Sequence, residues 1–166
     1  MINRQLRILG KEELYALLLE VASLTKENAD FLRLKLTEDK DEAIVYYKKK
    51  IKDSLWPKRI NLREARKAIS DFKRISKNSE PLLELMVFYV EQGMEIGEEY
   101  GDMYEAFYLS MESMFEHVIK MLNEYPDLIP KFKGRLDAVI DRSCEGWGHK
   151  DTLEDMYERL KIKREA

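Results

Sequence analysis

Apolar residues recur every three or four positions along most of the chain, which is the spacing of one face of an α-helix. Leu62, Ala65, Ile69, Phe72 and Ile75 form one such stripe. No stretch alternates apolar and polar residues convincingly, as a half-buried strand does. The sequence therefore predicts an all-α fold, a compact bundle or short helical array of about eight helices.

Polar residues that accept a hydrogen bond from a free main-chain N–H often stand directly before a helix. Asn61 is followed three positions later by Glu64, as in a capping box. Pro57 and Gly101 are expected to end helices, because proline cannot continue a helix and glycine accepts the backbone angles of a helix end. The residues expected to cap helices are Thr25, Asp41, Asn61, Ser79, Asp102 and Asp151.

The chain has 166 residues, which is enough for roughly one domain with a sizeable core. The loops between the expected helices are short, so we predict a single helical domain over residues 1–166. The apolar runs are too short to span a membrane, no apolar leader opens the chain, and Cys144 is the only cysteine. We therefore expect a cytoplasmic location and no membrane partner, because a reducing compartment keeps thiols free.

Two expected helices are the most apolar of the chain, and the first half of one, residues 82–90, is apolar on most sides, which is typical of helices in the middle of a domain. Phe88 and Phe115 lie on them and are expected to be buried. The methionines 103, 111, 114 and 121 favour the same interpretation, as core residues rather than as an adaptable docking groove.

Charge is segregated along the chain, although the net charge is only −3. Residues 48–77 hold twelve Lys or Arg against three acids, and residues 78–127 hold twelve acids against Lys120 alone. Opposite charges on neighbouring helices can pair within the chain or stay solvated on its surface. We expect this pairing or solvation to explain most of the pattern.

The basic segment 48–77 also supports an alternative, a nucleic-acid-associated regulator. Its cations could meet phosphates, and Tyr46, Tyr47 and Trp56 lie close by for base stacking. An isoelectric point of about 5.6 and the acidic segment that follows argue against it, so nucleic acid is not the expected partner. The candidate residues for binding nucleic acid or another partner are Lys58, Arg59, Arg63, Arg66 and Lys67.

The most unusual segment runs from Cys144 to Asp151 and contains Gly146, Trp147, Gly148 and His149. It offers a thiol, an imidazole and carboxylates, which could serve an enzyme if a base lay beside the nucleophile. The favoured interpretation is a packed turn, in which the two glycines permit the backbone, Trp147 fills the core and Asp151 caps the last helix. The candidate pocket residues are Glu112, Glu116, Trp147, His149 and Asp151.

Metal chemistry has weak support. Di-iron sites in helical bundles use Glu-x-x-His pairs, and neither His117 nor His149 has an acid three positions before it. The acidic face of residues 91–116 could bind Mg²⁺ or Ca²⁺ through carboxylate oxygens, although such faces are usually solvated. We expect no catalytic residue, no metal site and no cofactor, and we leave open whether the chain is an enzyme, with the balance against it.

Four segments carry a resemblance to a known family. They are Ala-Ile-Ser-Asp-Phe-Lys (68–73), Phe-Tyr-Val-Glu-Gln-Gly (88–93), Ser-Met-Glu-Ser-Met-Phe-Glu (110–116) and Gly-Trp-Gly-His (146–149). Together they resemble a bacterial family of small all-helical proteins that is filed as a domain of unknown function. The resemblance implies a cytoplasmic helical domain and assigns no activity or catalytic residue.

The expected function is a non-catalytic protein-interaction or scaffold module. Its partner is an unknown protein or a second copy of the chain. Two alternatives stay open: a nucleic-acid-associated regulator acting through residues 48–77, and an enzyme or metal protein acting through the turn 146–151 or the acidic face 91–116.

Overall fold

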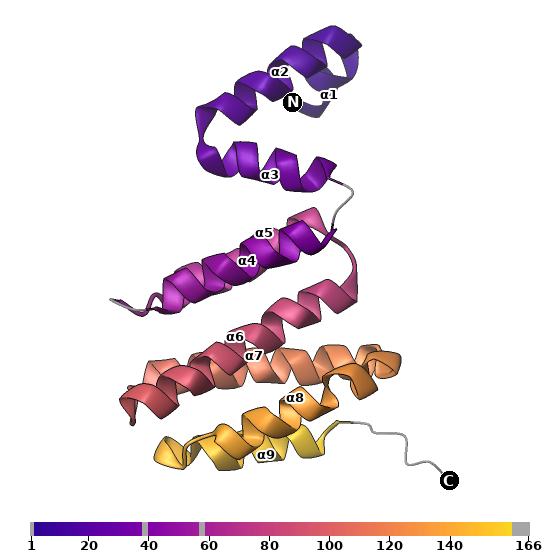
Figure 1. Cartoon of the computed structure of the whole chain (residues 1–166). Coiled ribbons are helices and arrows are strands. Elements are labelled where there is room, and N and C mark those ends of the chain that lie inside the picture. Colours follow the sequence, from indigo (N-terminus) through magenta and orange to yellow (C-terminus); the bar gives the residue numbers. More distant parts are fainter. Residues whose placement is uncertain (1, 38–39, 57–58, 161–166) are drawn as a thin grey trace. The chain divides into compact units, whose positions relative to one another are not determined.

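The structure is a computed structural model that describes residues 2–37, 40–56 and 59–160, without the side chains of residues 40 and 147. Helices follow one another throughout these ranges, joined by short turns (Figure 1). The helices are α1 (Ile2–Ile8), α2 (Lys11–Leu24), α3 (Lys26–Leu36), α4 (Lys40–Leu55), α5 (Leu62–Ile75), α6 (Ser79–Tyr100), α7 (Glu105–Glu124), α8 (Ile129–Arg142) and α9 (His149–Glu158), with 3-10 turns η1 (Pro126–Leu128) and η2 (Gly146–Gly148).

The all-α fold is confirmed: the described residues form nine α-helices and no strand, as expected for a helical array of about eight. The helix that the sequence did not predict is α1, which has seven residues. None of its residues is buried, so its sequence lacks the apolar stripe by which a helix that packs on a core can be predicted.

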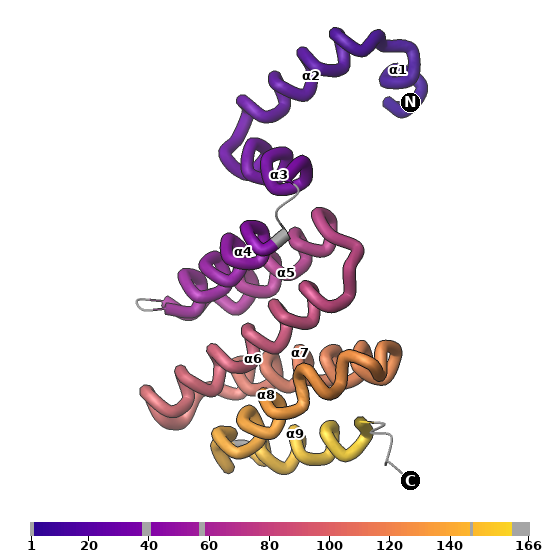
Figure 2. The backbone as a smooth tube through the Cα atoms, turned by 45° about the vertical axis from the view of Figure 1, so that its right-hand side comes forward, coloured from indigo at the N-terminus to yellow at the C-terminus, as the bar shows by residue number. Residues whose placement is uncertain are grey.

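The chain divides into two compact units, Met1–Ala43 and Ile44–Ala166. The single domain over residues 1–166 therefore stays a prediction. In the first unit, α2 and α3 pack against each other, yet neither α1 nor α2 has a buried residue. In the second unit, α6 and α7 pack along each other, α5 and α8 lie against α6, and α9 lies against α7 (Figure 2).

The second unit holds most of the core. Phe115 is fully buried, as expected, but Phe88 is partly exposed because it lies on the face of α6 where the Lys48 ammonium stands 5.1 Å from its ring centre. The largest fully buried side chains of this unit include Phe72, Tyr89, Phe107, Phe115, Phe132, Ile51 and Leu55.

Three predicted helix boundaries are confirmed. The side chain of Thr25 accepts a hydrogen bond from the N–H of Asn28 at 3.1 Å, and that of Asn61 accepts one from the N–H of Glu64 at 3.1 Å. Gly101 follows α6 with a φ of 77°, a left-handed conformation that favours glycine. Pro57 lies outside the described residues.

The four other predicted caps are wrong. Asn78, not Ser79, caps α6. Asp102 stands too far before α7 to cap it, and its Oδ1 instead accepts a hydrogen bond from the Tyr108 hydroxyl at 3.0 Å. Asp151 lies inside the first turn of α9, because Gly148 already turns the chain with a φ of 67°. Asp41 likewise lies inside the first turn of α4, and the residue before that helix is not described.

A cationic groove between α5 and α7

An open groove with a volume of about 710 Å³ runs between α5 and α7 in the second unit, and α6 contributes to its floor. This volume is within the range of ligand-binding clefts in proteins. The floor is apolar, and most of its side chains are buried except for a small exposed part that faces the groove. The floor residues are Ile69, Leu82, Met86, Met114 and Met121.

The sides of the groove are strongly basic. Glu124 is the one acidic side chain that the described residues contribute to its lining. The basic residues are Arg63, Arg66, Lys67 and Lys73 from α5, with His117 and Lys120 from α7. The groove therefore combines an apolar floor with a cationic border.

The sequence of α5 explains how one helix supplies most of this border. Ala65, Ala68, Ile69 and Phe72 face the core, so residues three, four and seven positions apart on the other side share a second face. Residues 63–73 on that face extend over about 15 Å, since a helix rises 1.5 Å per residue. The cations form a row along the groove rather than one point of charge.

Arg66 connects the two sides of the groove. Its guanidinium donates a hydrogen bond to the main-chain oxygen of Ser110 at 3.0 Å and approaches Ser113 Oγ at 3.3 Å. Ser110 Oγ also lies 2.7 Å from the buried Tyr89 hydroxyl. Arg66 is therefore held in place by α7, and its hydrogen bonds to Ser110 and Ser113 help to fix the width of the groove.

The other cations of the groove differ in how far they are neutralised. Lys120 pairs with Glu116 at 2.9 Å, one turn earlier on α7. Across the described part of the chain, no carboxylate lies within 4.0 Å of Arg63, Lys67 or Lys73. Three positive charges therefore border the apolar floor without an acidic partner.

The structure brings together three of the five residues predicted to bind nucleic acid or another partner, namely Arg63, Arg66 and Lys67. Arg59 is exposed but does not line the groove, and Lys58 lies outside the described residues. The prediction missed Lys73, His117 and Lys120 as groove residues. Lys73 lies seven residues after Arg66 on the same helical face, so helical spacing could have found it.

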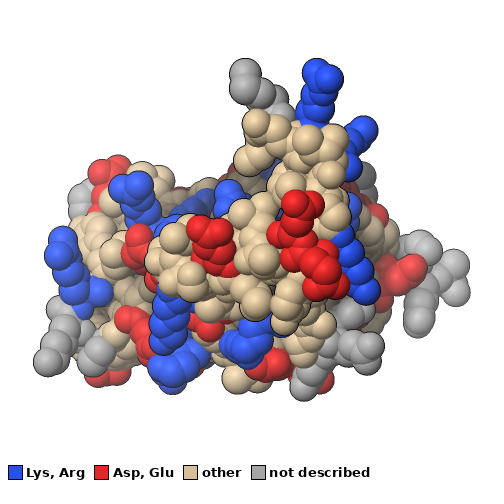
Figure 3. All heavy atoms as spheres, turned by 90° about the horizontal axis from the view of Figure 1, so that it is seen from above, with Lys and Arg blue, Asp and Glu red and all other residues tan. Residues whose placement is uncertain are grey.

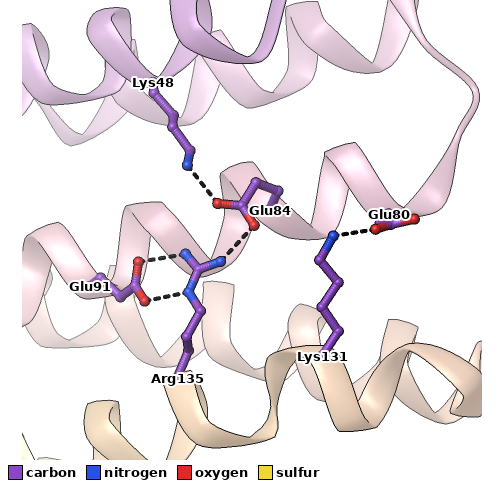
Figure 4. A network of polar contacts seen from close by, with 6 residues as sticks. All are labelled: Lys48, Glu80, Glu84, Glu91, Lys131 and Arg135. Atoms are coloured by element: carbon purple, nitrogen blue, oxygen red, sulfur yellow. Dashed lines mark hydrogen bonds and ion pairs between the residues drawn. The ribbon is translucent and has the colours of Figure 1, made fainter. Parts of the chain in front are cut away.

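The acidic helix α6 is neutralised mainly by α8, which follows the acidic segment in sequence (Figure 4). Arg135 donates two hydrogen bonds to Glu91, at 2.7 and 2.6 Å, and one to Glu84 at 2.6 Å. Lys48 reaches Glu84 from α4 at 2.6 Å. Two further pairs between α8 and α6 join Lys131 to Glu80 and Arg142 to Glu98.

These contacts shift the pKa of Glu84. Burial alone would raise it, but the hydrogen bonds and charges of Lys48 and Arg135 outweigh burial and hold the pKa below its usual value. Basic and acidic side chains are also interspersed on the face drawn in Figure 3. Among the ion pairs described, the acidic segment is thus paired mainly with α8, and Lys48 alone joins it from the basic segment 48–77, so the groove keeps its excess of cations.

The second predicted pocket is assembled only in part. His149 is fully buried, and its Nδ1 lies 2.8 Å from Glu112 Oε1. Glu116 points to Lys120 instead, and Asp151 is exposed on α9, so neither joins them. The side chain of Trp147 is outside the described residues.

A small cavity of about 60 Å³ lies beside this His149–Glu112 pair, lined also by Tyr108 and Cys144. Cys144 Sγ donates to the Tyr108 hydroxyl at 3.0 Å, and burial together with this hydrogen bond raises the pKa of Tyr108. The Nε2 atom of His149 has no hydrogen-bond partner among the described residues. The cavity has the volume of about two water molecules.

The described residues contain no group of three His, Cys, Asp or Glu side chains placed to hold a metal ion. Nor does any helix in the described ranges combine the length and the apolar character needed to cross a membrane. Comparison with protein-family models, with curated proteins and with solved structures gave no match.

Proposed function

We propose that the chain is a non-catalytic protein-interaction module whose cationic groove binds an acidic amphipathic helix of a partner. The observation that carries the proposal is the apolar floor bordered by Arg63, Lys67 and Lys73, which lack an acidic partner in the described part of the chain. Apolar side chains of a helix would fill the floor, and its acids would meet the border.

The shape of the groove favours a helix over a small anion. The cation row follows α5 for about 15 Å, the length of about ten helical residues. Three of the five floor residues are methionines, whose flexible side chains adapt to different apolar partners. A single carboxylate or phosphate would use only one end of such a row.

The nucleic-acid alternative has less support from the geometry. Single-stranded nucleic acids bind proteins through stacking on aromatic rings, and the groove lining has no Phe, Tyr or Trp side chain among its described residues. Tyr47, one of the expected stacking residues, is buried against Phe72 with ring centres 5.6 Å apart. Trp56 is half-buried beside Tyr100.

The catalytic alternative also has less support. His149 lines a cavity of about 60 Å³, which is the volume of about two water molecules and is small for a substrate site. His117 borders the larger groove, but its Nδ1 lies 2.5 Å from the main-chain oxygen of Ser113.

The proposal includes a bacterial origin and a cytoplasmic location, which are supported by the family resemblance and by the single cysteine.

The test measures binding of the full chain to a labelled synthetic helical peptide with leucines on one face and glutamates beside them. We expect micromolar affinity, which the double variant Lys67→Glu/Lys73→Glu weakens by at least about tenfold, or about 1.4 kcal/mol. The variant Lys52→Glu/Lys77→Glu makes the same change in net charge at two exposed lysines outside the groove lining and should bind normally.

A matched peptide with glutamine in place of glutamate should bind more weakly than the acidic peptide. The proposal is overturned if neither peptide binds the wild-type chain, or if both double variants weaken binding equally. Binding of single-stranded DNA that is tighter than peptide binding, and that the groove variant abolishes, would favour the nucleic-acid function instead.

A further inference from the structure

The first unit presents a helix, α2, of which one apolar face is exposed among the described residues. Nine large apolar side chains between Ile2 and Leu36 are exposed among the described residues. On α2, Tyr15 is 61% exposed, Leu18 49% and Leu19 54%. Contiguous exposed apolar surface of this kind marks an interaction site in soluble proteins.

Three of the exposed apolar residues of α2 lie on one face, whereas Val21 and Leu24, which are also exposed, lie on the other side. Tyr15, Leu18, Leu19 and Ala22 have the spacing i, i+3, i+4 and i+7, which places them along one stripe of a helix. Leu14 and Leu17, which are less exposed, lie outside this stripe. The helix therefore has a second apolar face beyond the one that its neighbours partly cover.

The net charge of α2 is opposite to that of the groove between α5 and α7. Glu12, Glu13 and Glu20 stand against Lys11 as the single base of this helix. Glu12 borders the apolar stripe, whereas Lys11 lies in line with the stripe and Glu20 lies on the other side of the helix. Residues 12–22 extend over about 15 Å, which equals the length of the cation row. Glu13 accepts a hydrogen bond from the N–H of Gly10 at 2.7 Å, so it fixes the start of the helix instead.

We propose that α2 of a second copy of this chain occupies the cationic groove, with Tyr15, Leu18 and Leu19 on the apolar floor. The inference rests on the proposed function and names its partner. Each chain carries both halves of the contact, an uncovered acidic and apolar helix and a basic groove with an apolar floor. One helix in one groove buries a small area, so the association is weak and dynamic.

The contact is heterologous, because it joins two different surfaces of the chain. Either two copies exchange their α2 helices reciprocally, or successive copies associate head to tail. Both arrangements need one intact α2 and one intact groove at each contact. This requirement separates the inference from simple aggregation of apolar surface.

The experiment measures the mass of the full chain by sedimentation equilibrium as a function of concentration. The wild type is expected to associate at micromolar concentration. Two variants should each stay monomeric: Leu18→Glu/Leu19→Glu, which changes α2, and Lys67→Glu/Lys73→Glu, which changes the groove. All four positions are at the surface, so the fold tolerates the changes.

Mixing the two monomeric variants is the decisive step. The groove of the α2 variant and the α2 of the groove variant are both intact, so the mixture should form a complex that neither variant forms alone. Two controls should associate like the wild type: Leu24→Glu, on the opposite side of α2, and Lys52→Glu/Lys77→Glu. A mixture that stays monomeric overturns the inference, as does a wild type that is monomeric throughout.

Failure of this inference can be told apart from failure of the proposed function. A monomeric wild type that still binds the synthetic acidic peptide keeps the groove function and rejects α2 as its occupant. Loss of both self-association and peptide binding rejects both. If both are correct, the peptide competes for the groove and dissociates the assembly.

Discussion

The guanidinium Nη1 of Arg66 donates a hydrogen bond to the main-chain oxygen of Ser110 at 3.0 Å, which ties α5 to the middle of α7. These two helices form the sides of the groove, and the bond spans from one to the other. Arg66 therefore differs from Arg63, Lys67 and Lys73, whose side chains have no such anchor on α7 among the described contacts.

Arg66→Ala should loosen the groove and reduce stability. Removing the guanidinium breaks its bonds to Ser110 and Ser113, and we expect a loss of about 1–3 kcal/mol in the free energy of unfolding, measured with urea. Arg66→Lys should not restore the full value, because an ammonium lacks the planar set of donors. Arg59→Ala, an exposed control, should leave stability unchanged, and an equal loss in both variants would contradict the assignment.

Gly93 and Gly97 provide a test of close packing in α6. A Cβ at Gly93 would lie 2.9 Å from Cγ of the fully buried Met111, whereas a Cβ at Gly97 would meet nothing within 4 Å. Gly93→Ala should therefore destabilise the protein by about 1–3 kcal/mol through overpacking. Gly97→Ala should stabilise it by up to about 1 kcal/mol, because alanine favours the helix. Thermal unfolding of both variants checks the opposite signs.

Phe115 and Phe88 lie on neighbouring helices but differ in burial. Phe115→Ala leaves a cavity in the core and should cost about 3–5 kcal/mol in the free energy of unfolding. Phe88→Ala should cost clearly less, because that ring is partly exposed beneath Lys48. Chemical denaturation measures both, and equal losses would show that Phe88 is as deeply packed as Phe115.

The ion pairs of Glu84 make stability depend on pH. Its folded pKa is lowered, so its contribution is present above the unfolded pKa, about 4.3, and is lost as pH falls through the folded value. Glu84→Gln should cost about 1–2 kcal/mol at neutral pH and flatten the acid side of the stability profile. Asp53→Asn, which breaks the exposed pair with Lys49, should change stability by about 0.5 kcal/mol or less. Equal acid profiles for the wild type and Glu84→Gln would contradict this account.

The sequence was sufficient for the fold class because helical spacing and capping are local properties. The Asn61 cap and the Gly101 helix end depend on residues within one turn, and both are confirmed. The caps at Ser79, Asp102 and Asp151 were wrong because a neighbouring residue, Asn78 or Gly148, or the hydrogen bond from Tyr108 decides each boundary. The preference of one residue type for the cap position does not show which of several neighbouring residues will occupy that position.

The groove could be predicted only in part because its two sides come from segments about fifty residues apart. The cations of α5 share one face, so Arg63, Arg66 and Lys67 could be grouped from sequence. His117 and Lys120 belong to an acidic segment, and only the packing of α7 opposite α5 makes them part of a basic site. His149 and Glu112 were both named, but their 2.8 Å contact required the packing of α9 on α7.

The central claim is that an acidic amphipathic helix binds on the apolar floor of the groove, and methionine methyl NMR of the full chain tests it most directly. Titration with the acidic peptide should shift the methyl signals of Met86, Met114 and Met121, which line the floor, and leave those of Met94 and Met156, outside the lining, in place. Unchanged floor signals at a peptide concentration that saturates binding, or shifts confined to Met94 and Met156, would contradict the claim.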